Sequence, residues 1–585
     1  MKHFNLRLKL LFLTVFAGVN FSAIAQGEPE LQPFAWNGSI SSDWDDPNNW
    51  TPNIVPVITS EITIPITGNA PTFTGVKTVE NVIINSGASL TIPVGATLNI
   101  TGDLDMYSES NSYASLIVNG TIAITGTAKY HRFTNSQSNG NDLIAPPLAG
   151  QTWSSFLTSD ANYNEGVIFN NGVQPTTTYL FGPFEKGATD DYLLYDDNST
   201  EVLVTGRGYR AATNTGNGAT LTFTGSVVTG PVVAPIQSDS SGQYSEWNLI
   251  GNPYPAYIDV EAFLTHVGSV SELPNMTLFD ESTAAIYGYN AETVDPGNKW
   301  TVLNLATGST LIAPGQGFFV SSSYPISSLE FTPDMQVAGN ADDFILGRQE
   351  DEPNDFAKIK MQSATNHWST SVYFHENGSN GLDVGYDACI YGSSVPDFCL
   401  YTHLLDNNED LPFAIQTLNT NVSNNVTVPL GVNASQGEQI TFSLEDSYLP
   451  EEIEVYLEDT LTGTSTLLNT LDYTITTTSS ISGTGRFFLH FATDDTLSLD
   501  ETNLNNLNDL NVYSNPTNRT ILVEGALQSE TKASVYDIHG RKVLQSKMDT
   551  SINRNVIMAN ELSSGVYVVQ LQNDYQEITQ KVIIK

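Results

Sequence analysis

Short apolar runs alternate with polar residues along the first part of the chain. Between residues 61 and 124, segments of three to five residues place an apolar side chain at every second position, and glycines stand between the segments. Such alternation is typical of half-buried β-strands, and glycine at the corners indicates tight turns. The pattern predicts a small β-solenoid or a tightly wound sheet with strands at 61–65, 82–84, 90–92, 97–100, 116–118 and 122–124.

The next two hundred residues contain an internal duplication. Four short segments recur in the same order at a nearly constant spacing: 143–147 with 249–253, 156–157 with 263–264, 206–209 with 315–318, and 221–224 with 329–332. Four ordered matches at one spacing indicate two related β units, which we expect to pack as a pseudo-symmetric pair.

Longer alternating strands return between residues 356 and 491, after a charged, proline-containing boundary at 350–355. Their rhythm predicts a β-sandwich or jelly roll. The fold class is therefore all-β and multi-domain: a solenoid-like module, duplicated β units, a sandwich and a small terminal Ig-like sandwich. The expected divisions are 1–25 (signal peptide), 26–130 (solenoid-like module), 131–240 and 241–345 (duplicated units), 354–497 (sandwich), 498–508 (linker) and 509–585 (terminal sandwich).

The charge of the chain is concentrated in its central part. Residues 26–508 hold 56 acidic and 11 basic residues, a net charge of −45, whereas residues 509–585 hold eight of each. A field of this sign repels phosphate backbones, so nucleic acid is excluded as a partner. The acidic surface is most simply a device that keeps the protein soluble.

The first 25 residues have the features of a secretory signal. Three basic residues precede a short apolar core, and Ala23-Ile24-Ala25 forms a small-x-small cleavage site before Gln26. That core is too short for a transmembrane span, and no second apolar stretch of spanning length follows. The mature chain is expected to lack a transmembrane segment and to be secreted.

Four separated motifs and a basic terminus mark the tail. Asn515-Pro516 and the Asp537 to Gly540 turn lie between alternating strands, Arg541 follows, Gly565 and Tyr567 open another strand, and Lys581 and Lys585 close the chain. Pattern alone predicts a sandwich of about seven strands. The order of these motifs closely resembles the type A C-terminal sorting domain of type IX secretion cargo in Bacteroidetes. That resemblance implies recognition by an outer-membrane translocon, and then removal by a surface sorting peptidase, often with attachment to anionic lipopolysaccharide.

Other segments resemble modules of exported Bacteroidetes proteins without adding chemistry. Trp36-Asn37-Gly38 with the Asp43 to Trp50 segment is similar to modules at the start of such proteins, and the second duplicated unit and the sandwich resemble parts of flavobacterial surface proteins. The tryptophan and aspartate cluster could bind sugar or calcium, or its tryptophans could cap one end of the solenoid.

The two cysteines, Cys389 and Cys399, flank a turn-rich segment and could face each other across a hairpin. In an oxidising compartment we favour a disulfide over two buried thiols. Calcium could bind the oxygen ligands of residues 406–410, although an EF-hand spacing is missing. No other metal or cofactor is indicated.

The sequence contains no nucleophile elbow, zinc motif or phosphate loop. Gly206-x-Gly208 has no following helix, His375 and His403 form only a faint set, and the aspartate pairs at 190–191, 196–197 and 494–495 are typical of solvated turns. We therefore expect a non-enzymatic adhesion protein or a binder of glycans or proteins. The alternative is a carbohydrate-active hydrolase or lyase with an unrecognised active site.

Overall fold

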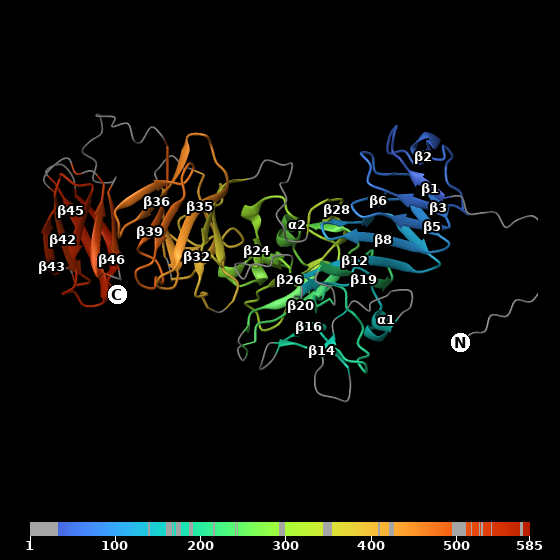
Figure 1. Cartoon of the computed structure of the whole chain (residues 1–585), viewed down its shortest axis with the longest axis horizontal. Coiled ribbons are helices and arrows are strands. Elements are labelled where there is room, and N and C mark those ends of the chain that lie inside the picture. The colour runs from blue at the N-terminus through green and yellow to red at the C-terminus, as the bar shows by residue number, and fades with distance from the viewer. Residues whose placement is uncertain are drawn as a thin grey trace, which may run out of the picture.

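The computed structural model describes most of the chain from residue 33 to residue 584. The described residues are 33–137, 141–158, 167, 169–170, 177–186, 191–213, 217–239, 242, 244–291, 299–342, 354–392, 394–407, 410–420, 426–493, 510–515, 518–525, 527, 531–539, 541–573 and 577–584. Figure 1 shows short strands almost everywhere in these segments, and the units follow one another along the long axis in sequence order. The predicted all-β, multi-domain fold class is confirmed. No helix within the described residues is long and apolar enough to cross a membrane.

The first unit is a solenoid of parallel strands. One face is built from β1 (Pro33–Trp36), β3 (Glu61–Ile64), β5 (Asn81–Ile84), β8 (Leu104–Glu109) and β12 (Ala128–Gln137), the second from β4 (Val76–Val79), β7 (Thr97–Ile100) and β11 (Thr121–Ile124), and the third from β6 (Ser89–Ile92) and β10 (Ser115–Val118). Neighbouring strands on each face are parallel, so each turn of the chain stacks on the one before.

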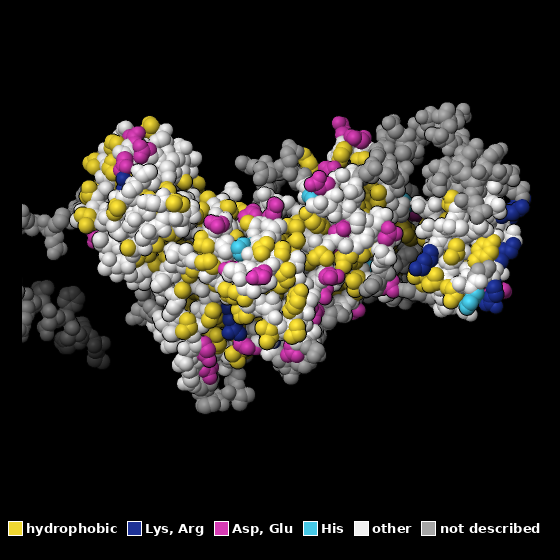
Figure 2. Space-filling model, turned by 180° about the vertical axis from the view of Figure 1, so that it is seen from behind, with side chains coloured by type: hydrophobic (Ala, Val, Ile, Leu, Met, Phe, Trp, Pro, Cys, Tyr) yellow, Lys and Arg dark blue, Asp and Glu magenta, His cyan; other side chains and the backbone are white. Residues whose placement is uncertain are grey.

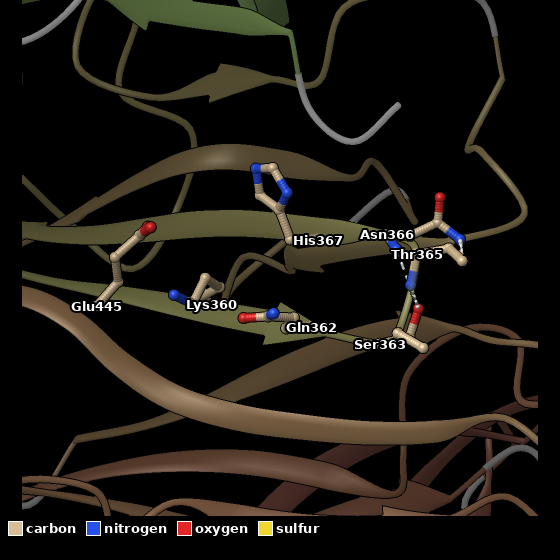
Figure 3. A pocket seen from close by; sticks show the side chains of 8 residues that line it. Lys360, Gln362, Ser363, Thr365, Asn366, His367 and Glu445 are labelled. Atoms are coloured by element: carbon tan, nitrogen blue, oxygen red, sulfur yellow. Dashed lines mark hydrogen bonds between the residues drawn. The ribbon is translucent and has the colours of Figure 1, made fainter. Parts of the chain in front are cut away.

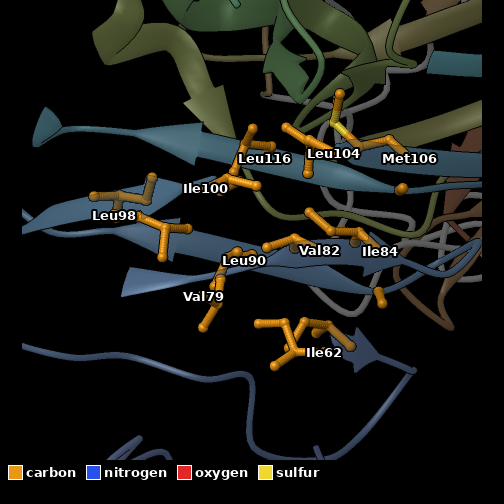
Figure 4. Close-up of a cluster of buried hydrophobic side chains, with 14 of the residues drawn as sticks. Ile62, Val79, Val82, Ile84, Leu90, Leu98, Ile100, Leu104, Met106 and Leu116 are labelled. Atoms are coloured by element: carbon orange, nitrogen blue, oxygen red, sulfur yellow. The ribbon is translucent and has the colours of Figure 1, made fainter. Parts of the chain in front are cut away.

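Apolar side chains fill the interior of this solenoid because alternate residues of every strand point inward. Ile62, Val82, Leu90, Leu98 and Leu104 are all fully buried. Figure 4 shows side chains of this cluster stacking from one turn to the next. The predicted alternation of short strands is therefore the signature of a wound coil with one continuous core.

Strand β12 belongs both to the solenoid and to the first duplicated unit. It pairs in parallel with β8 and antiparallel with β19 (Asn217–Gly225). The boundary expected at 130/131 falls inside this ten-residue strand. The two modules therefore share a strand and are not joined by a flexible connection.

The two duplicated units have the same sheet topology. The first has β13 (Asp142–Ile144), β18 (Tyr209–Ala211), β16 (Phe181–Glu185) and β17 (Asp191–Tyr192) in that order, and the second has β21 (Asn248–Gly251), β26 (Gly317–Val320), β23 (Ile286–Tyr289) and β24 (Trp300–Leu303). Each first strand is followed by a short helix, α1 (Trp153–Thr158) or α2 (Val260–Thr265). Equivalent outer pairs, β12 with β19 and β20 (Val232–Ile236) with β27 (Ser327–Phe331), complete the correspondence.

The two units contact each other through reciprocal hydrogen bonds. The Ala145 N–H donates to the Gly315 carbonyl at 2.8 Å, and the equivalent Gly251 N–H donates to the Gly206 carbonyl at 3.2 Å. Because each bond joins the same pair of repeat positions with the roles of the units exchanged, the contact is that of a two-fold pseudo-symmetric pair. We call this contact the repeat seam.

Glycines at the repeat seam allow the backbones to approach. A Cβ on Gly251 would lie 2.4 Å from the Ala145 Cβ, and one on Gly208 would lie 2.6 Å from the Ile250 carbonyl oxygen. The recurring Gly-x-Gly pattern therefore serves backbone packing between the units.

The following sandwich (354–493) is one curled sheet. Among its described residues the strands are β29 (Asp355–Gln362), β30 (His367–Phe374), β31 (Ala388–Cys389), β32 (Cys399–Thr402), β33 (Phe413–Leu418), β34 (Val426–Asn433), β35 (Gln439–Tyr448), β36 (Ile453–Asp459), β37 (Thr464–Leu467), β38 (Tyr473–Thr476) and β39 (Phe487–Thr493). Strands from both halves of this sheet contribute to one buried cluster, so the sheet closes around a single core.

An aromatic joint connects the sandwich to the second duplicated unit. Tyr391 of the sandwich stacks on Trp300 with ring centroids 3.9 Å apart and lies 4.5 Å from the Trp247 ring. The Tyr287 hydroxyl donates to the Cys389 carbonyl at 2.7 Å. A buried cluster drawn from both units surrounds these groups, so the joint resembles a domain core.

The terminal unit is a small sandwich. Its described strands form a three-stranded sheet of β40 (Asn511–Asn515), β41 (Thr520–Glu524) and β44 (Arg554–Met558), and a four-stranded sheet of β43 (Lys542–Lys547), β42 (Lys532–Asp537), β45 (Gly565–Gln572) and β46 (Glu577–Ile584). The predicted seven strands are present, and one apolar cluster fills the space between the sheets. Figure 2 shows basic side chains gathered at this end of the molecule, whereas acidic ones are scattered over the rest.

Candidate functional site

An ordered aromatic surface lies on the outer face of the solenoid where β8, β12 and β19 adjoin. The Tyr107 ring stacks on the His131 ring at a centroid distance of 4.3 Å and an interplanar angle of 9°. His131 is fixed on both sides: one ring nitrogen lies 2.9 Å from the Asp105 carboxylate and the other lies 3.0 Å from the Thr222 hydroxyl. We call this set the Tyr107 surface.

Charged groups border the Tyr107 surface. Lys129 lies 2.9 Å from an Asp103 oxygen and 3.6 Å from an Asp105 oxygen. The Thr127 N–H and then Lys129 lower the pKa of Asp103. Partial burial, and next the charge of Asp105, raise the pKa of Tyr107, so its hydroxyl remains a neutral donor at physiological pH. The surface thus combines a flat ring with oriented hydrogen-bonding groups.

The chemistry of the Tyr107 surface favours binding. Tyr107 is 40% exposed and is held by its stacking partner, so its ring can receive an apolar ligand face at little cost in conformational freedom. No sequence motif points to Tyr107 or His131. Their alternation along neighbouring strands could have placed them on one face, but the pairing of β8 with β12 and of β12 with β19 had to be known.

A second candidate is a polar hollow at the β29–β30 hairpin. It has a volume of about 260 Å³ and is lined by Lys360, Gln362, Ser363, Ala364, Thr365, Asn366, His367 and Glu445. Figure 3 shows His367, Lys360 and Glu445 along one side and the turn residues at the other end. Glu445 accepts from the Ser369 hydroxyl at 2.7 Å and pairs with Lys358 at 3.1 Å.

The electrostatics of this hollow keep its carboxylate charged. Burial raises the pKa of Glu445, but Lys358, Ser369 and Lys360 together hold it below its ordinary value, so the carboxylate stays ionised. Glu445 is the single carboxylate among the lining residues, whereas glycoside hydrolysis uses two. The hollow can hold a small polar group.

The tryptophan and aspartate cluster of the N-terminus is a structural cap. Trp36, Trp44 and Trp50 are at most 1% exposed and pack edge to face, with centroids 5.1 and 4.8 Å apart. Asp43 and Asp46 serve local turns, in which Asp46 accepts from the Asn48 N–H at 2.9 Å, whereas Asp45 pairs with Lys77 at 2.5 Å. The tryptophans therefore cap the end of the solenoid, as the second alternative expected. Their rings are buried and cannot stack on a sugar.

The favoured disulfide between Cys389 and Cys399 does not form in the structure, and this expectation is corrected. Both residues are free and buried. The segment between them does not close as a hairpin, because β31 pairs with β33 while β32 pairs with β33 and β34. Cys389 packs in one cluster with Leu404 and Phe413, and Cys399 packs in the aromatic joint. Burial raises the pKa of both thiols, that of Cys389 to about 12.

The remaining polar candidates are not brought together. The His375 ring accepts from the Asn377 N–H, whereas His403 is buried beside Tyr401. Asp197 accepts from the Thr177 N–H and the Tyr179 hydroxyl, and so it holds its turn to an earlier segment of the chain. Within the described residues no group of three or more histidine, cysteine or acidic side chains could hold a metal ion. Residues 190, 408–409 and 494–495 lie outside the described residues, so the calcium prediction for 406–410 stays a prediction.

Several sorting motif residues have defined structural roles. Asp537 ends β42 and accepts from the N–H groups of Arg541 and His539, which, with the Arg541 side chain, lower its pKa. The Tyr567 hydroxyl donates to the Ser563 carbonyl at 2.8 Å. Gly565 opens β45, Lys581 lies opposite Val568, and Asn515 ends β40. Pro516, Gly540 and Lys585 lie outside the described residues, as do Ala23, Ala25 and Gln26 of the predicted signal.

Comparison with known families identifies the class of protein from the tail. Residues 511–585 match the secretion system C-terminal sorting domain. The chain is therefore a cargo of type IX secretion, exported to the cell surface or the medium, and the resemblance of the tail motifs is confirmed.

The part before the tail defines the family. Residues 35–491 match the family described as "Domain of unknown function (DUF8693)", and the chain belongs to that family. No curated protein matches the chain. A solved structure described as "Biofilm associated protein - BSP domain" is 9% identical, covering 76% of this chain and 90% of that chain, with a TM-score of 0.17, which is too low to indicate a shared fold.

Proposed function

We propose that this exported protein is a non-enzymatic binding protein and that the Tyr107 surface contacts a neutral, hydroxyl-rich glycan. The observation that carries the proposal is the exposed, stacked Tyr107–His131 pair, which is held in place by Asp105 and Thr222. Sugar rings present an apolar C–H face that packs on an aromatic ring, while their hydroxyls bond to neighbouring polar groups.

The charge of the chain supports the neutrality of the ligand. A net charge of −45 over residues 26–508 repels a polyanionic polysaccharide. Asp103, Asp105 and Lys129 border the ring and offer both acceptors and a donor to hydroxyl groups. A shallow surface of this kind suits adhesion to a repeated polymer, in which many weak contacts add together.

The test is binding of the mature chain to a glycan array, followed by Tyr107→Ala. Loss of the stacking ring is expected to weaken binding about tenfold, and Tyr107→Phe should retain most of it. Tyr324→Ala is the matched control, because Tyr324 is 41% exposed but lies between β26 and β27. Unchanged binding by Tyr107→Ala would contradict the proposal.

The alternative, a hydrolase or lyase, is tested on the same material. Turnover of any bound glycan, lost on Glu445→Gln but retained in Tyr107→Ala, would assign activity to the hollow at the β29–β30 hairpin. Binding without turnover supports the non-enzymatic proposal.

A further inference from the structure

The terminal sandwich contacts the preceding sandwich through the outer face of its three-stranded sheet. Leu522 lies between the core residues Ile521 and Val523 and so points outward, yet it is only 5% exposed. On the other side, Phe488 alternates with the core residues of β39 and is 6% exposed. The Phe488 and Tyr513 rings have centroids 5.7 Å apart. Two outward-facing apolar side chains are therefore buried where the units meet.

A chain of polar contacts crosses the same boundary. Arg554 of β44 lies 2.9 Å from Glu458 of β36 and, through its Nε atom, 2.9 Å from Glu524 of its own unit. Glu458 in turn lies 3.0 Å from His490, whose other ring nitrogen lies 3.0 Å from the Thr427 hydroxyl. The guanidinium group is thus shared by carboxylates from both units.

A sorting motif residue adds a third contact. The Asn515 side-chain amide donates to the Gly485 carbonyl at 3.3 Å. Gly485 has a φ of +102°, and a Cβ there would lie 3.5 Å from the Asn515 oxygen. The turn before β39 therefore presents its carbonyl to the end of β40.

We propose that the sorting domain is docked on its own passenger, and that the outer face of β40, β41 and β44 is a recognition surface for the outer face of β36 and β39. Arg554 determines the docking because it joins Glu458 to Glu524, while Phe488, Tyr513 and Leu522 exclude water beside it. We call this contact the Arg554 latch.

Charge is compatible with this choice of partner. The passenger is strongly acidic, and residues 509–585 hold as many basic as acidic residues, so the passenger does not repel them. An arginine with planar donors can bond to two carboxylates at once. The contact is small, so it is sustained by the high effective concentration that the covalent connection provides.

Docking has a consequence for export. The three-stranded sheet faces the passenger, and so the four-stranded sheet is the face left to the secretion machinery while the passenger is folded. Without this contact, the sorting domain would sample many orientations relative to the passenger.

The experiment measures the distance distribution between two spin labels in residues 26–585, a chain that keeps the sorting domain. Leu461→Cys in the passenger and Ile538→Cys in the sorting domain place the labels at side chains that are 68% and 74% exposed. The native thiols are buried and react slowly with the label. A single narrow distribution is expected for the parent, and Arg554→Glu should broaden it, because the domain is then no longer held on the passenger.

Two further variants make the test specific. Arg541→Gln removes a charge from the same domain at the Asp537 turn and should leave the distribution narrow. The double variant Arg554→Glu with Glu458→Arg should narrow it again. A broad distribution in the parent, or a narrow one in Arg554→Glu whose strands are intact by circular dichroism, would overturn the proposal.

Discussion

The two ends of the 354–493 sandwich meet their neighbours in different ways. Towards the N-terminus, Tyr391 inserts among Trp247, Tyr287 and Trp300 in an aromatic joint with the character of a domain core. Towards the C-terminus, the Arg554 latch consists of one shared guanidinium, one amide contact and a few apolar side chains. The first joint makes the modules from 33 to 493 one body, and the second leaves the sorting domain separable.

The family match follows the same division. A single match spans residues 35–491 and a separate one covers 511–585. The shared strand β12, the repeat seam and the aromatic joint explain physically why the first stretch behaves as one unit. The contrast between the two joints can be tested by substitutions on either side.

The largest effect is expected from Trp247→Ala at the aromatic joint. Trp247 is fully buried against Tyr287 and Tyr391, and removal of such a side chain costs about 3–5 kcal/mol. Denaturant unfolding of the mature chain should show this loss and a separate transition for the sandwich. A decrease of less than about 1 kcal/mol in the free energy of unfolding would contradict the core-like packing of the joint.

The next largest effect is a pH dependence of the free energy of unfolding. It arises from Asp387, in the loop whose backbone contacts the second unit. Burial raises its pKa to about 7, despite hydrogen bonds from the N–H groups of Asp383 and Thr417. An unfolded aspartate titrates near 3.9, so the folded state binds this proton more tightly. The carboxyl stabilises the fold below about pH 4, and this contribution is lost as the pH rises through about 7.

Asp387→Asn isolates that contribution. The unfolding free energy of the parent minus that of the variant should fall by on the order of 3 kcal/mol between pH 4 and pH 8. A flat difference across this range would show that Asp387 does not titrate as inferred.

A smaller effect is expected at the repeat seam. Gly251→Ala places a Cβ 2.4 Å from that of Ala145, so the seam must open, at a cost of about 1–3 kcal/mol. Gly230→Ala is the matched control, because nothing lies within 4 Å of its added Cβ. Equal melting temperatures of the two variants would contradict the close approach.

The smallest effect distinguishes the latch from the joint by salt. Raising the ionic strength to about 1 M shortens the Debye length to about 3 Å and weakens a partly exposed ion pair worth about 0.2–1 kcal/mol. The spin-label distance distribution across the Arg554 latch should broaden, whereas the free energy of unfolding of the 33–493 body should not fall. If salt does not change the distance distribution, the contact is held by the apolar side chains of Phe488 and Tyr513.

The local sequence pattern was enough to predict the strands, but it could not predict which strands lie side by side. The alternation in 61–124 and the spacing of the duplicated segments predicted the solenoid and the paired units, because both depend on periodicity along one strand or one repeat. The Tyr107 surface depends on which strands are neighbours, and Asp105, His131 and Thr222 come from three of them. No local signal carries that information.

The cysteines show the same limit. Their spacing and the turn residues between them favoured a hairpin disulfide, but both flanking strands pair with β33, which lies further along the chain. The role of Arg554 could not be predicted from the sequence either, because its partner Glu458 lies on another unit.

The repeat seam also constrains how the exported chain folds. Until the second unit has folded, Ala145 and Gly206 of the first unit lack their partners Gly315 and Gly251, so these backbone groups stay unpaired. Since the seam is self-complementary, a first unit exposed at that stage can pair with the same edge of a neighbouring chain. Rapid folding of the second unit therefore protects the protein from assembling with the wrong molecule.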